Sequence, residues 1–437
     1  MPKITSVIGL GYLGVTQAAV LASLGHTVIG VDPDEDKVKQ LNSGIVPFFE
    51  PGLDQLLQEG LSRGLLSFRG TIDDLDANVD VHFLCVGTPS KEDGTGVDTS
   101  FLSQAISQLA SVLAERATIV GRSTVPVGTA AVLEDQLKGL TDKEFHLIWN
   151  PEFLSEGTAI RDSLSPERIV IGSNSPFGET TLRDVYREII DKNVPVFVLD
   201  RQTSELVKIA SNAYLALKIS YINGVAQIAE KTGASTAQLA DAMGLDSRIG
   251  RKFLNNGLGF GGGCLPKDLH GFAAIARETG SIHFSELLQA VDDLNTDRRS
   301  RVVEIAIELL GGLKNKKITV LGASFKPNTD DVRLSPALQV ADHLRQLGAI
   351  VTIHDPIALP KVNAYYPELI QEESLEESFA GAELLILATE WSQYKNLNAE
   401  NTGLLVKNKF LLDARNVFNA HYWQKAGWVI KKLGEGL

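Results

Sequence analysis

The chain has 437 residues, and at about 150 residues per domain this length predicts two or three domains. Acidic residues outnumber basic ones by 54 to 41, and the resulting net charge of −13 argues against general binding to nucleic acid or to anionic membranes. Only two cysteines occur, Cys85 and Cys264, which excludes a disulfide framework and predicts a reducing, cytoplasmic location. No stretch approaches the ~20 uninterrupted apolar residues of a membrane span, so we expect a soluble protein.

The first 200 residues alternate short apolar runs with helix-like stretches. Strands separated by helices require crossover connections, which predict a parallel sheet covered on both faces. The expected strands are Ile4–Leu10, Thr27–Asp32, Val79–Thr88, Ala117–Ser123, His146–Asn150, Arg168–Gly172 and Pro195–Leu199.

The first expected strand leads directly into a glycine motif, GLGYLG, which contains Gly9, Gly11 and Gly14 and precedes a helical pattern. Glycines at this place permit a tight turn and the close approach of a pyrophosphate to a helix N-terminus. Asp32 ends the next strand about 20 residues later, where a carboxylate accepts hydrogen bonds from a ribose diol and repels the extra phosphate of NADP. The pattern therefore predicts an NAD site, and the alternative is a strand–helix turn without a ligand.

The pattern changes after Asp200. The range Thr203–Thr232 contains no proline and is followed by Gly233, which predicts one long helix. Because one side of this helix is apolar along its length, we expect it to pair with its symmetry mate in a two-fold homodimer. Helical pattern continues to about Leu310.

A second alternating region follows, with expected strands at Ile318–Leu321, Ala349–His354, Leu384–Ala388, Phe410–Asp413 and Trp428–Ile430. The predicted fold class is α/β, with two Rossmann-like parallel-sheet domains joined by a long central helix and a helical middle domain. The expected boundaries are 1–200 for the NAD-binding domain, 201–312 for the central domain and 313–437 for the C-terminal domain.

Two further loops follow strands of the first region and contain Thr88 and Thr124. Loops at the carboxyl ends of parallel strands line the ligand crevice, so both threonines are candidates for cofactor contact, although each can instead satisfy a local turn. Cys85 lies inside an apolar strand and is interpreted as a small buried hydrophobe.

The densest signal is the segment Gly257–Cys264, in which five of the first seven residues are glycine. Such a run cannot favour a helix or a strand, but it lets the backbone bend around a ligand and present the cysteine. Lys267 would favour the Cys264 thiolate electrostatically. A flexible linker with a buried thiol is the alternative.

Two more groups of polar residues are candidates for chemistry. Lys208 and Asn212 are four residues apart on the long helix and share one face, where they can orient a substrate hydroxyl or simply be solvated. Glu152 and Glu156 follow an expected strand, and either can act as a general base or cap the next helix.

With these residues assembled, the chain resembles the UDP-glucose 6-dehydrogenase family of nucleotide-sugar dehydrogenases over nearly its whole length. The matching motifs, in chain order, are GLGYLG, VGTPSKEDG, STVPVGT, NPEFLSEGTAI, ELVKIASNAYLALKISYINGVA, RIGRKFLNNGLGFGGGCLPKD and FKPNTDDVR. The resemblance implies oxidation of the sugar 6-hydroxyl to a carboxylate with two NAD molecules reduced per turnover. It implies no metal.

The resemblance also implies roles for individual residues. Cys264 corresponds to the nucleophile, and the other catalytic positions are Lys208, Asp268, Thr124, Glu152 and Asn212. Positions that match NAD-contacting residues are Gly9, Gly11, Leu13, Gly14, Asp32, Lys37, Thr88, Thr124, Glu156, Lys267 and Arg333.

Substrate positions follow in the same way. Arg248 resembles an arginine that reaches the substrate of the other subunit. The remaining positions that match substrate-binding residues are Glu152, Phe153, Leu154, Ser155, Glu156, Lys208, Asn212, Phe253, Leu254, Asn255, Asn256, Gly257, Gly261 and Lys326.

Three positions depart from the family pattern: Gly263 replaces a usual serine, Leu334 a common glutamate and Phe49 a frequent tyrosine. None of the three removes a catalytic group, so they bear on the sugar and not on the reaction, and UDP-N-acetylhexosamine and GDP-mannose remain alternatives to UDP-glucose. A two-electron hydroxy-acid dehydrogenase and a non-catalytic NAD-binding sensor are the competing functional classes.

Overall fold

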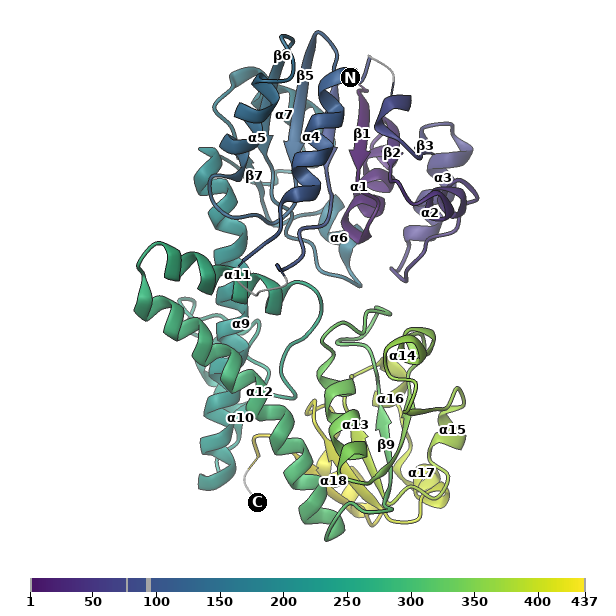
Figure 1. Ribbon diagram of the computed structural model, residues 1–437. Helices are drawn as coiled ribbons and strands as arrows, with labels where there is room; N and C mark the ends of the chain where they lie inside the picture. The colour runs from purple at the N-terminus through teal and green to yellow at the C-terminus, as the bar shows by residue number, and fades with distance from the viewer. Residues whose placement is uncertain (1, 76–77, 92–95, 436–437) are drawn as a thin grey trace. The chain divides into compact units, whose positions relative to one another are not determined.

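The computed structural model describes residues 2–75, 78–91 and 96–435 (Figure 1). It divides into two compact units, Met1–Ser211 and Asn212–Leu437, which are described separately below. Glu92, Asp93 and Gly94, which belong to the VGTPSKEDG motif, lie outside the described residues.

The first unit is built on an eight-stranded sheet with the order β3-β2-β1-β4-β5-β6-β7-β8. Its strands are β1 Ile4–Ile8, β2 Thr27–Val31, β3 Leu66–Arg69, β4 Val81–Leu84, β5 Arg116–Gly121, β6 Glu144–Trp149, β7 Ile169–Gly172 and β8 Val196–Leu199. Its helices are α1 Tyr12–Ser23, α2 Glu35–Asn42, α3 Leu53–Ser62, α4 Ser100–Val112, α5 Thr129–Lys138, α6 Ala159–Leu164, α7 Pro176–Val185 and α8 Arg187–Ile190, with a 3₁₀ turn at Ile72–Asp74.

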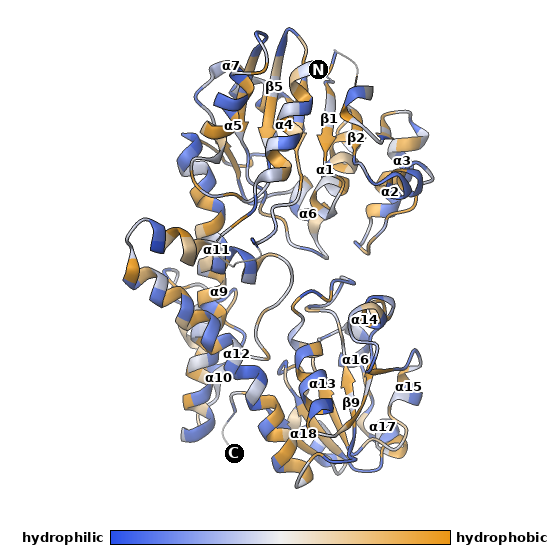
Figure 2. Ribbon diagram, in the orientation of Figure 1, coloured by the Kyte–Doolittle hydropathy of each residue, from blue (hydrophilic) through white to orange (hydrophobic). Residues whose placement is uncertain are grey.

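Apolar side chains cover both faces of this sheet, as expected from its strands. Val7 and Phe83 point into the core on one face, whereas their neighbours Ile8 and Leu84 point into the core on the other. Figure 2 shows the hydrophobic residues concentrated along the strands and the helices that flank them. The prediction of a parallel sheet buried on both faces is therefore confirmed in its main feature.

One pair of strands runs against this prediction. β6 and β7 are antiparallel, paired through Trp149 and Gly172, while β7 and β8 are parallel to each other. The connection from β6 to β7 contains the six-residue helix α6 and does not make a crossover, so the chain returns along the sheet in the opposite direction. β3 was not expected from the sequence, because its two buried residues, Leu66 and Phe68, form only a brief alternation between glycines.

The helix α9, Arg201–Thr232, begins in the first unit and continues into the second. It confirms the expected Thr203–Thr232 helix and begins two residues earlier. Asp200 accepts the backbone N–H of Thr203 at 2.7 Å and so satisfies a donor of the first turn. Glu205 in turn accepts the N–H groups of Gly128 and Ala130 at 2.6 and 2.7 Å, which ties the start of α9 to the N-terminus of α5.

The second unit combines helices with a six-stranded parallel sheet of order β11-β10-β9-β12-β13-β14. Its strands are β9 Lys317–Leu321, β10 Ile350–His354, β11 Ile370–Gln371, β12 Leu384–Leu387, β13 Phe410–Asp413 and β14 Val429–Lys432. Its further helices are α10 Thr236–Gly244, α11 Leu265–Glu278, α12 Ile282–Leu310, α13 Pro336–Gln346, α14 Leu359–Tyr365, α15 Leu375–Ser378, α16 Ser392–Lys395, α17 Ala399–Leu405 and α18 Ala420–Lys425. The five strands expected here are confirmed, and the two-residue β11 was too short to be recognised.

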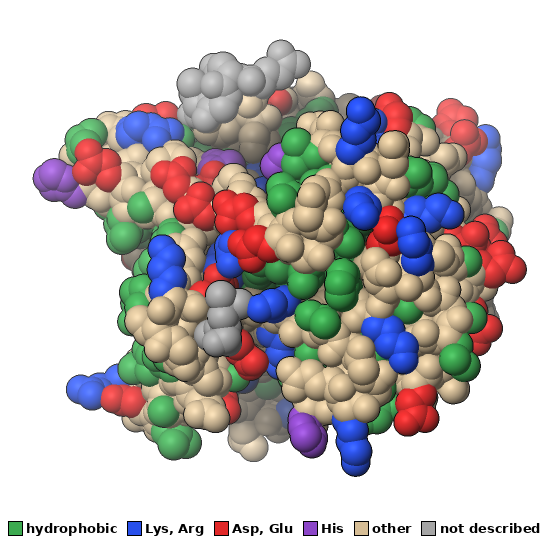
Figure 3. Space-filling view, turned by 90° about the horizontal axis from the view of Figure 1, so that it is seen from below, with side chains coloured by type: hydrophobic (Ala, Val, Ile, Leu, Met, Phe, Trp, Pro, Cys, Tyr) green, Lys and Arg blue, Asp and Glu red, His purple; other side chains and the backbone are tan. Residues whose placement is uncertain are grey.

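Charged side chains of both signs are interspersed on the face shown in Figure 3. In the described part of the chain, no helix is long and apolar enough to cross a membrane.

Candidate functional site

The glycine loop between β1 and α1 has the geometry of an anion site. Gly9 has φ +89° and its Cα faces the backbone of Val86, so a Cβ there would lie 2.7 Å from the Val86 Cα. Gly11 faces open space, which leaves its backbone accessible to a ligand. α1 begins at the next residue without a side-chain cap and without an acidic residue in its first turn, so its N–H groups remain available for a pyrophosphate.

Asp32 lies at the end of β2 beside this loop, as the sequence predicts. Its carboxylate accepts the N–H of Leu10 at 2.8 Å and the ammonium of Lys37 at 3.0 and 3.1 Å. Asp32 thus supports the glycine loop from one side and is itself oriented by Lys37. The residues present fit the binding of a dinucleotide with an unmodified ribose.

The loops after β4 and β5 are bonded to each other. The Thr88 hydroxyl donates to the Thr124 carbonyl at 2.8 Å, and the Ser123 hydroxyl donates to the Val86 carbonyl at 2.7 Å. Because both loops leave the carboxyl ends of adjacent parallel strands, these bonds hold Thr88 and Thr124 together at one edge of the first sheet. Cys85 is buried, and burial raises the pKa of its thiol to about 12, which confirms that it is an inert hydrophobe.

Lys208 and Glu152 form a buried ion pair in the same unit. The Lys208 ammonium lies 2.8 Å from Glu152 Oε1, and the two side chains are only 5% and 11% exposed. Glu152 Oε2 also accepts the N–H of Leu154 at 2.9 Å, while the Phe153 ring packs under the Arg168 guanidinium at 3.9 Å. The structure therefore brings two of the expected catalytic side chains into direct contact.

Glu50 is a site residue that sequence reasoning missed. Its buried carboxylate accepts the Tyr12 hydroxyl and the N–H groups of Gly157 and Ala159, the last two at 2.5 and 2.7 Å. Burial, followed by the hydrogen bond and charge of Glu50, raises the pKa of Tyr12, which keeps its hydroxyl a donor. Glu50 therefore joins the first turn of α1 to the segment that contains Glu152. The only sequence signal was a carboxylate inside an apolar run before Pro51.

In the second unit, the glycine-rich segment is closely packed against its own chain. A Cβ at Gly259 would overlap Asn295 on α12, and one at Gly261 would overlap the Leu334 carbonyl. The Gly262 N–H donates to the Arg333 carbonyl at 2.9 Å, and the Arg333 guanidinium lies against the Cα of Gly263. The glycines thus allow close backbone packing, and the alternative of a flexible linker with a buried thiol is wrong.

Cys264 is exposed and occupies the N-cap position of α11. The positive end of a helix dipole favours a thiolate at this position, in addition to the charge of Lys267. In the first turn of α11, Asp268 is buried, receives the Asn212 amide at 2.6 Å and pairs with Lys267 at 2.7 Å. Cys264, the expected nucleophile, and Asp268, Lys267 and Asn212 therefore lie on two neighbouring elements of one unit.

Other expected site residues are bonded to neighbours in the sequence. Arg248 is bonded to Asp246, and its side chain is 87% exposed. Arg333 is held in a bidentate pair by Asp331. The Lys326 ammonium lies 5.3 Å from the centre of the Phe325 ring. Over residues 2–75, 78–91 and 96–435, no group of three or more His, Cys, Asp or Glu could hold a metal ion.

A glycine loop at the N-terminus of α1, followed by a carboxylate at the end of β2, is the arrangement of a dinucleotide-binding protein. The chain belongs to the UDP-glucose/GDP-mannose dehydrogenase family. Residues 3–190 match the NAD-binding domain of that family, 202–297 the central domain and 319–420 the UDP-binding domain. NAD is therefore the cofactor, and the protein is an oxidoreductase.

Individual relatives are similar to this chain over nearly its whole length. UDP-glucose 6-dehydrogenase TuaD of Bacillus subtilis is 36% identical, and the match covers 99% of this chain and 93% of that protein. The UDP-glucose dehydrogenase of Pyrobaculum islandicum is 35% identical, with a TM-score of 0.89 and 98% of both chains covered. The UDP-D-ManNAc dehydrogenase of Pyrococcus horikoshii is 27% identical, with a TM-score of 0.85 over 98% of this chain and 99% of that one.

Proposed function

We propose that this protein oxidises UDP-glucose to UDP-glucuronate in a four-electron reaction through a covalent thioester on Cys264. The observation that carries the proposal is the exposed Cys264 at the N-terminus of α11, next to the buried Asp268–Lys267–Asn212 cluster. The named UDP-glucose dehydrogenases, at 35% and 36% identity, support this sugar over the N-acetylated one named for the relative at 27%.

The chemistry explains why a thiol is required. NAD, when bound, accepts one hydride from the sugar carbon in each of the two oxidations. The first oxidation turns the C6 alcohol into an aldehyde, whose trigonal carbon is a poor hydride donor. Addition of the Cys264 thiolate forms a C–S bond and makes this carbon tetrahedral, so loss of a second hydride and the hydroxyl proton leaves a thioester. Water then breaks the C–S bond, which releases the acid and regenerates the thiol.

The remaining catalytic side chains have roles suited to their chemistry. Lys208 and Asn212 are four residues apart on α9, so their side chains lie on one face and can stabilise the charge that develops on the substrate oxygen. Glu152, paired with Lys208 at 2.8 Å, is suited to accept a proton from the attacking water, with Thr124 as a hydrogen-bonding partner. Asp268 orients Lys267 and Asn212 around the nucleophile.

We also propose that the expected binding residues contact NAD and the sugar nucleotide, that the chain forms three domains, and that it assembles as a homodimer. The matches to the NAD-binding, central and UDP-binding models support domains at 1–200, 201–312 and 313–437. Exposed Tyr214, Tyr221 and Ile228 on α9 support a homodimer. A reducing, cytoplasmic location is consistent with two cysteines that are both thiols.

Product stoichiometry tests the proposal against its alternatives. We expect two NADH per UDP-glucose consumed and UDP-glucuronate as the product, measured by absorbance and mass spectrometry. UDP-N-acetylmannosamine, UDP-N-acetylglucosamine and GDP-mannose should show kcat/KM values lower by about tenfold or more, a difference of about 1.4 kcal/mol in transition-state binding. One NADH per turnover would instead indicate a two-electron dehydrogenase. No turnover with any nucleotide sugar would favour an NAD-binding sensor.

Replacement of the nucleophile tests the covalent step. Cys264→Ser keeps the loop but replaces a thiolate with a poorly ionised hydroxyl, so acid formation should fall by at least about a hundredfold. Oxidation to the aldehyde does not need the thiol and should persist slowly, and NAD affinity should be unchanged. Cys85→Ser is the matched control, because Cys85 is buried and should affect stability rather than the reaction. Acid formation by Cys264→Ser at near the wild-type rate would contradict the thioester.

A further inference from the structure

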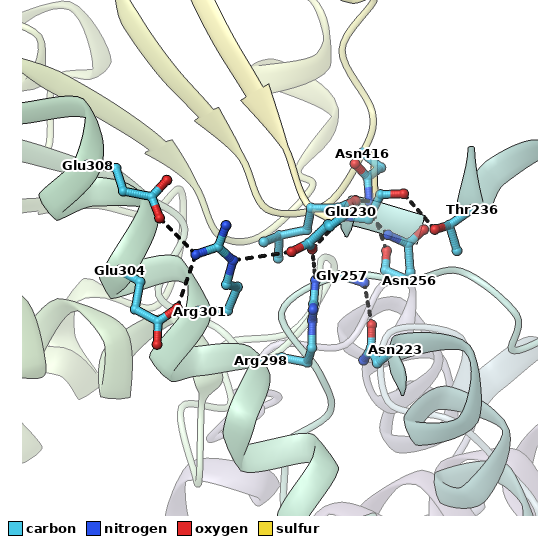
Figure 4. A network of polar contacts seen from close by, with 12 residues as sticks. Asn223, Glu230, Thr236, Asn256, Gly257, Arg298, Arg301, Glu304, Glu308 and Asn416 are labelled. Carbon is cyan, nitrogen blue, oxygen red and sulfur yellow. Dashed lines mark hydrogen bonds and ion pairs between the residues drawn. The ribbon is translucent and has the colours of Figure 1, made fainter. Parts of the chain in front are cut away.

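The segment Leu433–Glu435, which follows β14, is bonded to the helical part of its own unit. Ser235 and Glu435 form an antiparallel bridge, and Thr236 donates to the Gly434 carbonyl from its hydroxyl at 2.5 Å and from its N–H at 3.3 Å. The Gly434 N–H donates to Glu230 at 2.8 Å. Figure 4 shows the network of polar contacts in which Glu230 of α9 and Thr236 of α10 take part. Both peptide groups of Gly434 are therefore bonded.

Glu230 is fixed from the other side by two arginines of α12. Arg298, which is fully buried, donates to Oε1 at 2.8 Å, and Arg301 donates to Oε2 at 3.2 Å. Burial by itself would raise the pKa of Glu230, but the hydrogen bond and charge of Arg298 outweigh it and hold this pKa below its usual value. Glu230 is therefore an ionised, oriented acceptor for the Gly434 N–H.

The same segment contacts the loop that contains Asn256. The Leu433 carbonyl accepts the Asn256 amide at 2.6 Å and the Asn416 amide at 2.9 Å, and Asn416 also donates to the Asn256 carbonyl at 3.2 Å. The next residue, Gly257, donates its N–H to Asn223 of α9 at 2.8 Å. The side chain and the carbonyl of the buried Asn256 are thus both held, and the backbone of 256–257 is fixed by Asn416 on one side and by Asn223 of α9 on the other (Figure 4).

Gly434 is the residue on which this arrangement depends most directly. Its φ is +75°, a conformation that favours glycine, and a Cβ there would overlap the Asn256 amide and lie 2.8 Å from the Ala226 Cβ. Any side chain at 434 must therefore displace the Asn256 amide or the segment itself. A substitution at position 434 therefore moves Asn256 without changing any residue of the loop that contains it.

We infer that Leu433–Glu435 and Glu230 are positioning elements of the nucleotide-sugar site, which act by fixing the loop Phe253–Gly257 through Asn256. This inference rests on the proposed function, which assigns that loop to substrate binding. It gives Glu230 and Gly434 a role in substrate affinity although neither belongs to the loop. The Asn256 amide is committed to the Leu433 carbonyl, so Asn256 sets the shape of the loop for its neighbours Phe253 and Asn255.

The test compares two glycines of the same unit. Gly434→Ala should raise KM for UDP-glucose by about tenfold or more, because small displacements of a positioning group are costly, while KM for NAD stays unchanged. Gly427→Ala is the matched control: Gly427 also has positive φ, +87°, but a Cβ there meets only the flexible Lys409 side chain at 3.9 Å. Both variants should lose thermal stability, because both place alanine at a positive φ, and only Gly434→Ala should change the KM for the sugar nucleotide.

A second pair of variants tests the role of Glu230. Glu230→Gln keeps the shape of the side chain but removes the charge that holds the Gly434 N–H, and it should raise the KM for UDP-glucose. Glu304 accepts a hydrogen bond from Arg301 at 3.0 Å on the side away from Glu230. Glu304→Gln removes the charge of this outer partner and should leave the KM for UDP-glucose unchanged. Equal KM values for Gly434→Ala and Gly427→Ala would show that the segment contributes only to folding and would overturn the inference.

Calorimetric titration with UDP separates this inference from the proposed function. We expect the Kd for UDP to rise in Gly434→Ala and Glu230→Gln and not in their controls. If the wild-type protein bound UDP but did not oxidise UDP-glucose, the proposed sugar would be wrong, while the changes in Kd would still support the positioning role. Unchanged Kd values in both variants would overturn that role, whatever the sugar.

Discussion

Gly11 and Gly14 belong to one motif, but the structure requires them for different reasons. A Cβ at Gly14 would overlap the Gly9 carbonyl, so this glycine lets α1 pack against the loop. A Cβ at Gly11 would meet no protein atom within 4 Å, so this glycine leaves space for a ligand. One position is therefore required by folding and the other by cofactor binding.

Alanine at these two positions should separate stability from binding. We expect Gly14→Ala to lower Tm by several degrees, as overpacking of a buried site costs about 1–3 kcal/mol. Gly11→Ala should keep the wild-type Tm without ligand but raise KM for NAD about tenfold or more, because its methyl group occupies the approach of the pyrophosphate. Scanning calorimetry and initial rates check both. Equal losses of Tm would contradict the distinction.

We expect Asp32 to determine the choice between the two nicotinamide cofactors. Its carboxylate, oriented by Lys37 at 3.0 Å, would repel a 2′-phosphate, so kcat/KM for NAD should greatly exceed that for NADP. Asp32→Asn should lower the ratio of kcat/KM for NAD to that for NADP. The variant weakens NAD binding, and it removes the repulsion of the 2′-phosphate of NADP. Initial rates with both cofactors measure the ratio. Comparable kcat/KM values in the wild-type protein would contradict the assignment.

At the residue scale, the sequence predicted where candidate groups lie along the elements better than which residues hold them in place. Gly9, Asp32 and Cys264 stand in motifs with a fixed relation to a strand or a helix start, and the structure places each of them at that position. Glu50, Asn295 and Glu230 act through contacts with residues far away in the sequence. No local spacing identifies such contacts.

At the scale of elements, the two sheets share a strand order but differ at the edge where ligands bind. Gly322 follows β9 as Gly9 follows β1, and each donates its N–H across to the neighbouring strand at 2.8 Å. Asp355, the counterpart of Asp32, accepts N–H groups from Ala323, Ser324 and Ala358 and the Trp391 indole. The Asp32 oxygens are likewise bonded within the protein, to the N–H groups of Leu10 and Asp34 and to Lys37. The two edges differ at the second position after the first glycine, which is Gly11 in the first sheet and Ser324 in the second.

The helix that presents Cys264 is supported by a pH-dependent contact. His270 of α11 is 3.0 Å from Asp292 of α12, and the hydrogen bond to Asp292 raises the pKa of His270 above its usual value. A raised histidine pKa stabilises the fold fully below about pH 6.5, the unfolded value, and this contribution is lost as pH rises through the folded pKa. The contact between α11 and α12 is therefore stronger in mild acid.

His270→Gln should reveal this dependence. We expect the variant to lower Tm more at pH 6 than at pH 8.5, because only the protonated histidine gains the charge interaction with Asp292. His421→Gln on α18, where the histidine is exposed, is the control and should leave Tm unchanged at both pH values. Scanning calorimetry provides the measurement. A Tm difference that is the same at both pH values would contradict a role for the charge.

At the scale of the whole molecule, the alternation of strands and helices was sufficient to predict two α/β sheets and a long helix between them. The antiparallel pairing of β6 and β7 was not predictable in this way, because strand direction depends on whether a connection crosses the sheet and not on the composition of the strands. The two short strands β3 and β11 were also missed, since a period of two needs several residues to become visible.

The prediction of a homodimer rests on large apolar side chains that are exposed on α9. Tyr214, Tyr221 and Ile228 are 56%, 50% and 64% exposed, and they follow one another at intervals of seven residues on α9. This spacing corresponds to about two helical turns and places all three on one face. A straight stripe of large apolar side chains on a 32-residue helix suits packing against a second copy of the same helix about a two-fold axis.

Sedimentation tests this assembly. The wild-type protein should sediment at micromolar concentration with twice the chain mass of 47.2 kDa. Tyr221→Lys, at the centre of the stripe, should shift it to the monomer because two lysines would face each other across the two-fold axis. Leu404→Lys is the matched control, since Leu404 is 84% exposed on α17 and away from the stripe, and it should leave the dimer intact. If Arg248 completes the neighbouring site, the Tyr221→Lys monomer should also lose most of its activity and keep its affinity for NAD. A monomeric wild-type protein, or a Tyr221→Lys variant that remains dimeric, would show that α9 is not the interface.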